Sequence, residues 1–138
     1  MKKQADIKDK KDKYYVAKTS GKFGLHFSFL CAINGIIATF KSQRNFKIQS
    51  IFAIVAIVLS VVLKLEPSEF LLILIFIALV LSLECVNSAI EACIDLQCKE
   101  YSELAKIAKD ACAGGVLVSS LCALIAAIVL FLPKILNL

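Results

Sequence analysis

The sequence has little of what most metal and redox sites are built from. It has one histidine, His26, and none of its six cysteines belongs to a C-x-x-C pair. Most of these cysteines lie in apolar runs, so we interpret them as small buried thiols on helices. The stretch TSGKF lacks the first glycine of a phosphate loop, because Val16 stands there, and has Phe23 in place of Ser/Thr. A Walker A motif is therefore excluded.

Charge is also scarce for a chain of 138 residues, of which 20% are charged and 59% are apolar. Soluble domains are usually 45–50% apolar, and a chain this short buries too small a share of its surface to hide so much apolar area from water. Disordered chains are poor in apolar residues, so disorder is excluded as well. The composition predicts an integral membrane protein with one domain.

The positive charge gathers at the start of the chain. Residues 1–47 hold eleven Lys/Arg against three Asp, whereas the remainder holds five Lys against eight acids. We interpret residues 1–22 as a basic cytoplasmic tail and residues 23–138 as the membrane domain. No signal peptide is predicted. Nucleic acid is the alternative partner for a basic tail, but its charges are interleaved and no nucleic-acid motif follows, so none is expected to bind.

The first apolar segment, 23–42, repeats large apolar side chains at steps of four and three. The repeat consists of Phe23, Phe27, Leu30, Ile33, Ile37 and Phe40. It predicts an amphipathic helix that lies on the membrane surface. A short core helix is the alternative.

Three membrane spans are predicted after it, at about 46–65, 68–96 and 109–132, which makes the fold all-α. Pro67 suits the first turn of the second span, and Pro133 should end the third. The connection 97–110 carries three Lys and should be cytoplasmic, whereas the turn 66–69 carries only acids and should lie outside. The N-terminus is then cytoplasmic and the C-terminus outside.

Four polar side chains interrupt the second span with helical spacing. Glu84, Asn87, Glu91 and Asp95 share an arc of about 80° on one helix face. A carboxylate inside the bilayer costs about 2.5–3.5 kcal/mol on insertion scales. A single Glu could simply join two helices, but a stripe that runs from lipid depth to cytoplasmic water favours a site where a membrane-dissolved substrate meets a soluble one.

The third span opens with a charged pair, Lys109 and Asp110. Alone, this pair is typical of the charged flank of any span. Beside the stripe it favours an anion site, because Lys109 could neutralise phosphate and the N-terminal amides of the helix could assist.

These residues resemble a known family. The segments Glu84-Cys-Val-Asn87-Ser-Ala-Ile-Glu91, then Asp95, then Ala108-Lys109-Asp110-Ala are similar to the signature of the prokaryotic diacylglycerol kinase and undecaprenol kinase family. With the spans, the resemblance covers roughly residues 22–133. The segment FKSQRNFKI and the ending FLPK look closer to the branch that uses undecaprenol.

The resemblance implies a homotrimer of three-span chains with shared active sites, which transfers the γ-phosphoryl group of ATP to a lipid hydroxyl with Mg²⁺. It implies that Glu84 is the general base at the lipid hydroxyl and that Glu91 holds the metal and the nucleotide phosphates. Asn87 would support this site, and Lys109 and Asp110 would contact ATP.

The chain departs from the family at two positions. Gln43 stands where the family usually has a second metal-ligating Glu, and Gly24 stands where a basic residue typically reaches ATP. A neutral amide oxygen is a weaker partner for Mg²⁺. A catalytically weak or silent trimer that binds lipid and nucleotide is therefore one alternative, and a small ion-conducting oligomer is another.

Overall fold

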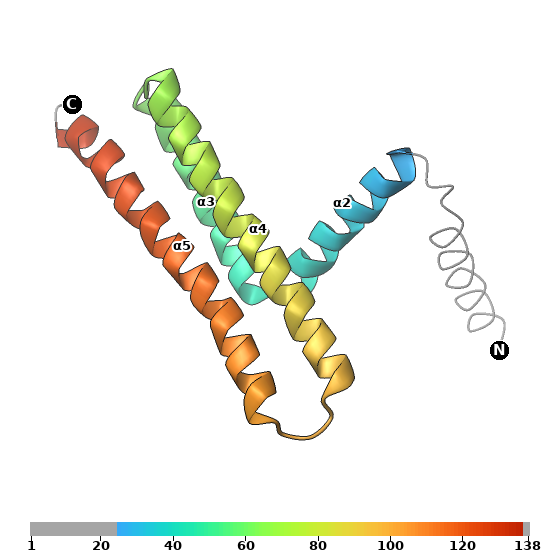
Figure 1. Cartoon of the computed structure of the whole chain (residues 1–138). Helices are drawn as coiled ribbons and strands as arrows, with labels where there is room; N and C mark the ends of the chain where they lie inside the picture. Colours follow the sequence, from blue (N-terminus) through green and yellow to red (C-terminus); the bar gives the residue numbers. More distant parts are fainter. Residues whose placement is uncertain (1–24, 137–138) are drawn as a thin grey trace. The chain divides into compact units, whose positions relative to one another are not determined.

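The computed structural model describes residues 25–136, and these form four helices and no strand. The helices are α2 (Leu25–Ser42), α3 (Arg44–Val62), α4 (Pro67–Gln97) and α5 (Glu103–Leu136), joined by short connections (Figure 1). The predicted all-α class is confirmed. The basic tail 1–22 and the departure at Gly24 lie outside the described residues.

All four helices are long and apolar enough to cross a membrane. The three predicted spans correspond to α3, α4 and α5, and the chain is a multi-pass membrane protein. By length and composition α2 qualifies as well, so its location on the membrane surface stays a prediction. A boundary between two compact units falls within α2, after Ile37. Helices α3, α4 and α5 all belong to the second unit.

The turn between α3 and α4 is tight because each helix end satisfies its own backbone. Lys64 has a positive φ of 49°, and the amides of Lys64 and Leu65 donate to the carbonyls of Val61 and Ser60. This is the left-handed cap that commonly ends a helix. Pro67 then occupies the first turn of α4, as predicted.

Acidic side chains cap the N-terminus of α4. The Glu66 amide donates to Glu69 Oε2 over 2.8 Å, and the Glu66 side chain accepts from the backbone of Glu69. Such a reciprocal capping box satisfies donors that a helix N-terminus leaves free. Helix α4 begins at Pro67, one residue before the predicted start of the second span.

The predicted end of α5 at Pro133 is wrong, because the helix continues through this residue to Leu136. Proline lacks one amide hydrogen and usually breaks helices in their interior. Here it lies in the last turn, so only three helical residues follow it. Lys134, the next residue, forms an ion pair of 2.7 Å with Glu69 and so ties the end of α5 to the start of α4.

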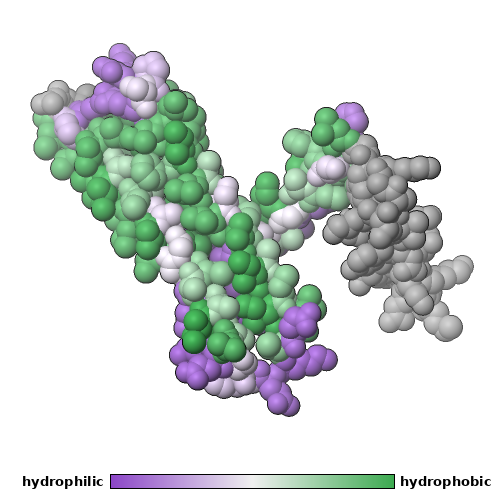
Figure 2. Space-filling model, viewed as in Figure 1, coloured by the Kyte–Doolittle hydropathy of each residue, from purple (hydrophilic) through white to green (hydrophobic). Residues whose placement is uncertain are grey.

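Helix α4 lies between its two neighbours, packing most extensively on α5 and also on α3. The core is thin: Phe46, Ile73, Val80, Val116 and Phe131 are its buried apolar side chains. Most large apolar side chains of these helices face outward. Figure 2 shows them as a broad hydrophobic band between hydrophilic ends, which is the surface expected of a protein in lipid.

Candidate functional site

The polar stripe of α4 runs from the interior of the bundle to its surface. Glu84 is 2% exposed and Asn87 7%, whereas Glu91 is half-buried and Asp95 is exposed. Glu84 lies seven residues before Glu91, or about 10 Å along the helix. The stripe thus places one carboxylate among apolar side chains and the others progressively closer to the polar end of α4.

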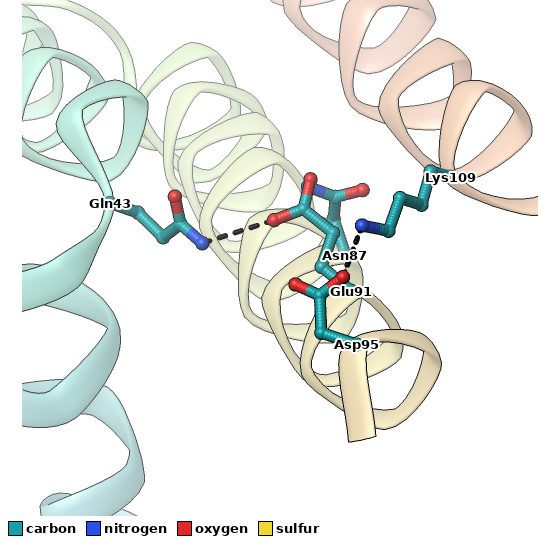
Figure 3. A network of polar contacts seen from close by, with 5 residues as sticks. All are labelled: Gln43, Asn87, Glu91, Asp95 and Lys109. Carbon is teal, nitrogen blue, oxygen red and sulfur yellow. Dashed lines mark hydrogen bonds and ion pairs between the residues drawn. The ribbon is translucent and has the colours of Figure 1, made fainter. Parts of the chain in front are cut away.

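Glu91 is held by two amide side chains (Figure 3). Gln43 Nε2 donates to Glu91 Oε2 over 3.1 Å, and Asn87 Nδ2 donates to Glu91 Oε1 over 3.1 Å. Asn87 reaches Glu91 because residues four apart lie on the same helix face. Both carboxylate oxygens therefore accept a neutral donor.

Gln43 reaches Glu91 from the junction of α2 and α3. It is the single non-helical residue between them and caps α3 with an extended backbone. The backbone amide of Gln43 donates to the Thr39 carbonyl over 2.8 Å. On either side of it in the chain, Phe40 and Phe46 pack edge to face, with their ring centres 6.3 Å apart. These local contacts fix the position of the backbone from which the Gln43 side chain extends.

Lys109, in the second turn of α5, forms an ion pair with Asp95. Figure 3 shows the ammonium group on the α5 side of α4, next to the cluster around Glu91. Asp110 is exposed, and no contact among the described residues joins it to this cluster. The structure thus brings Gln43 together with four of the predicted stripe and pair residues, and it leaves Glu84 deeper and Asp110 outside.

The cluster around Glu91 offers oxygen ligands. Asn87 Oδ1 is buried and has no hydrogen-bond partner in the structure, and Gln43, whose Nε2 faces the Glu91 carboxylate, carries a second amide oxygen on the same side chain. No group of three His, Cys, Asp or Glu within residues 25–136 is arranged to hold a metal. Magnesium is commonly bound by one or two carboxylates together with substrate phosphates, so one carboxylate and two amide oxygens fit that ion when phosphates complete its ligands.

Sequence reasoning missed Gln49, one and a half turns into α3. Its side chain lies next to the Glu84 carboxylate, and its Oε1 atom is buried without a hydrogen-bond partner. The available signal was a lone glutamine within the apolar segment 46–65, where an unpaired polar group is costly.

The sequence is similar to known proteins. The family model for prokaryotic diacylglycerol kinase matches residues 30–131. A diacylglycerol kinase of Synechocystis sp. is 38% identical over 112 residues, which cover 80% of this chain and 64% of that protein. An undecaprenol kinase of Bacillus subtilis is 36% identical over 108 residues, which cover 78% of this chain and 88% of that protein. The chain thus spans less than two thirds of the first relative and most of the second.

Proposed function

Because this chain belongs to the prokaryotic diacylglycerol kinase family, we propose that it is an ATP-dependent lipid kinase. The acceptor is the hydroxyl group of a membrane lipid alcohol. Undecaprenol is preferred over diacylglycerol, because FKSQRNFKI and FLPK resemble the branch that uses the polyprenol. The similarity to the Bacillus subtilis undecaprenol kinase supports this preference.

One observation carries the proposal: a buried carboxylate and a polar cluster lie on the same helix. Glu84 is nearly inaccessible to water, whereas Glu91 and Asp95 lie toward the polar end of α4. A lipid hydroxyl can approach Glu84 from the hydrocarbon layer, and a nucleotide can approach Glu91 from water. Phosphoryl transfer between the two phases needs such a path.

Glu84 is the general base in this reaction. As the lipid oxygen forms a bond to the γ-phosphorus of ATP, the bond from that phosphorus to the bridging oxygen breaks and ADP leaves. The hydroxyl proton passes to the Glu84 carboxylate. A positioned base of this kind typically contributes 10²–10⁴-fold to the rate.

The cluster around Glu91 binds the phosphates of ATP. Glu91, Gln43 and Asn87 would hold Mg²⁺, which would neutralise charge on the phosphoryl group. Lys109 attracts the phosphates from the second turn of α5, and Asp110 contacts the nucleotide beside it. Asp95 orients Lys109 through their ion pair.

We also propose the assembly and orientation. Three copies form a homotrimer with shared active sites, and this assembly covers part of the apolar surface that a single chain leaves exposed. The protein lies in the cell membrane with its N-terminus in the cytoplasm and its C-terminus outside. The three Lys of the connection 97–110 favour this orientation.

A second candidate function is a weak or silent trimer that binds lipid and nucleotide without turnover. The observation that favours it is the hydrogen bond from Gln43 to Glu91, because an amide there supplies one less negative charge for Mg²⁺. The intact Glu84, Glu91 and Lys109 favour the active enzyme instead.

The decisive experiment measures phosphorylation of undecaprenol and of diacylglycerol, at matched mole fractions in detergent micelles, by the wild type and Glu84→Gln. The substitution keeps size and hydrogen bonding but removes the proton acceptor, so we expect a loss of about 10²–10⁴-fold. Glu100→Gln, in the exposed connection between α4 and α5, is the matched control and should keep its rate.

Undiminished turnover in Glu84→Gln would refute the assignment of the base. A higher rate with diacylglycerol would refute the substrate preference. Absence of phosphorylation with either lipid, in protein that still binds nucleotide, would favour the silent trimer.

A further inference from the structure

One face of α3 carries a row of exposed side chains that begins charged and continues apolar. Its members follow one another at steps of three and four, which places them on the same face of the helix: Arg44, Lys47, Ile51, Ile54 and Val58. Ile51 and Ile54 are 62% exposed, and Val58 is 54% exposed. We call this row the outer face of α3.

The outer face is separate from the packed side of the helix. On the packed side, Phe46 is buried and Gln49 lies next to the Glu84 carboxylate. At about 100° per residue, Gln49 lies roughly 140–180° around α3 from every member of the outer face. A ligand on the outer face therefore does not reach Glu84.

Three cations without counter-charges lie at the polar end of the outer face. Lys41, in the last turn of α2, is exposed and precedes Arg44 by three residues, as Arg44 precedes Lys47. Neither α2 nor α3 contains an aspartate or a glutamate. The ion pairs among residues 25–136 join α4 to α5, and none of them includes one of these cations.

The other lysines at this end of the bundle have acids close by. Lys99 is followed by Glu100, and Lys106 lies three residues after Glu103. Lys109 has its own partner on α4. Cations are expected at the cytoplasmic end of any span, but cations without acids beside them call for an anion from outside the chain.

The apolar part of the outer face has the length of one membrane leaflet. Val58 lies eleven positions after Lys47, which corresponds to about 16 Å of α-helix. Half of a hydrocarbon core of about 30 Å is about 15 Å. With the cations at the level of the lipid headgroups, Val58 therefore lies near the midplane of the bilayer.

We infer that the outer face of α3 binds an anionic glycerophospholipid. Its phosphate lies beside Arg44 and Lys47, and an acyl chain runs along the three apolar side chains toward Val58. The guanidinium group of an arginine can donate two parallel hydrogen bonds to phosphate oxygens. Lys41 adds to the attraction for the negative headgroup. This lipid is a bound neighbour of the protein and not the alcohol that is phosphorylated.

The charges favour this occupant over a helix of a second copy. Such a helix could cover the apolar side chains, but it would have to supply acids at the level of Arg44 and Lys47. Helices α2 and α3 have none, and the acids of α4 at this end already have partners, since Glu91 accepts from two amides and Asp95 pairs with Lys109. A phospholipid supplies the anion and the apolar chain together.

The test measures equilibrium binding of two phospholipids that differ in net charge, dioleoylphosphatidylglycerol and dioleoylphosphatidylcholine. Native mass spectrometry of the full-length protein in micelles gives the dissociation constant of the first bound lipid. Each basic side chain near the headgroup favours the anionic lipid roughly fivefold, so Arg44 and Lys47 together should make the wild type prefer phosphatidylglycerol by about 25-fold. The double variant Arg44→Gln/Lys47→Gln should lose this factor.

The matched control is Lys99→Gln/Lys106→Gln, which removes the same charge at the same end of the bundle and should keep the preference. Retained binding of phosphatidylcholine by Arg44→Gln/Lys47→Gln shows that this variant is folded. Equal affinity of the wild type for both lipids would overturn the inference, and so would an unchanged preference in Arg44→Gln/Lys47→Gln. An equal loss in the control would also overturn it, because any two cations at this end would then serve.

A second variant, Ile51→Ala/Ile54→Ala, tests the path of the acyl chain. It should weaken the binding of both lipids alike and leave the preference unchanged. The same spectra report the mass of the oligomer, and dissociation of the oligomer in this variant would overturn the inference, because the outer face would then contact a second copy. None of these measurements depends on turnover, so failure of the proposed kinase activity would leave the inference standing.

Discussion

The substitution Gln43→Glu changes the atom that faces the Glu91 carboxylate. In the structure, Gln43 Nε2 donates to Glu91 Oε2 over 3.1 Å. Glutamate has nearly the same size, but it replaces this donor by an oxygen that shares a negative charge. The variant therefore loses one hydrogen bond and places two carboxylates side by side, and it restores the acidic residue that the family usually has at this position.

The structure allows the size of the change to be worked out. A hydrogen bond is worth about 1 kcal/mol net. Two unit charges about 4 Å apart repel by about 4 kcal/mol at an effective dielectric constant of 20. Water near the half-buried Gln43 screens this repulsion further, so we take it as an upper bound. A bound divalent cation removes this repulsion, so relief of the repulsion adds to the binding free energy of the ion. Each 1.4 kcal/mol of binding free energy changes the affinity tenfold. We expect the Mg²⁺ concentration for half-maximal effect to fall, by about tenfold if roughly 1.4 kcal/mol of the repulsion remains and by at most roughly several hundredfold.

Two assays measure this effect. One follows undecaprenol phosphorylation against Mg²⁺ concentration, and the other follows the thermal stability of nucleotide-free protein against Mg²⁺, because a bound ion stabilises the folded state in proportion to its affinity. Gln43→Met removes the amide without adding charge, and it should shift both curves in the opposite direction. In the Glu91→Gln background the effect of Gln43→Glu should disappear, because the second carboxylate no longer has a partner with which to share the ion.

An unchanged Mg²⁺ dependence in Gln43→Glu would refute this reasoning and would mean that position 43 does not face the metal. A shift that persists in the Glu91→Gln double variant would show that the two side chains do not hold the same ion.

Two further predictions concern the architecture. A reporter fused after Leu138 should lie outside the cell. Cys98, which is exposed after the end of α4, should react with a thiol reagent only from the cytoplasm. Labelling of Cys98 from outside alone would contradict the orientation. Lys64→Gly should raise the thermal midpoint of the detergent-solubilised protein, because a left-handed conformation costs roughly 1–2 kcal/mol for a residue with a side chain. Lys99→Gly, in the connection between α4 and α5, should not raise the midpoint. A lower midpoint for Lys64→Gly would show that the Lys64 side chain stabilises the turn.

The sequence by itself determined the helices and the polar stripe, because both depend on local periodicity. Apolar runs of bilayer length predict spans whatever their neighbours are. The spacing of Glu84, Asn87, Glu91 and Asp95 places them on one face of any α-helix. Pro67 and Glu69 mark the start of α4 for the same reason, since the capping box joins residues three apart in the chain.

Only the tertiary structure decided which distant side chains meet. Gln43 and Glu91 are 48 positions apart, and the order of residues says nothing about which amide atom faces the carboxylate. Gln49 beside Glu84 and Lys134 beside Glu69 became apparent only when α3 and α5 were packed against α4. The expectation that Pro133 ends the third span is wrong because the helix-breaking tendency of proline is a local property. Its cost depends on how near the end of α5 it lies. Contacts between helices follow from packing of their faces, and in this chain that packing forms the site.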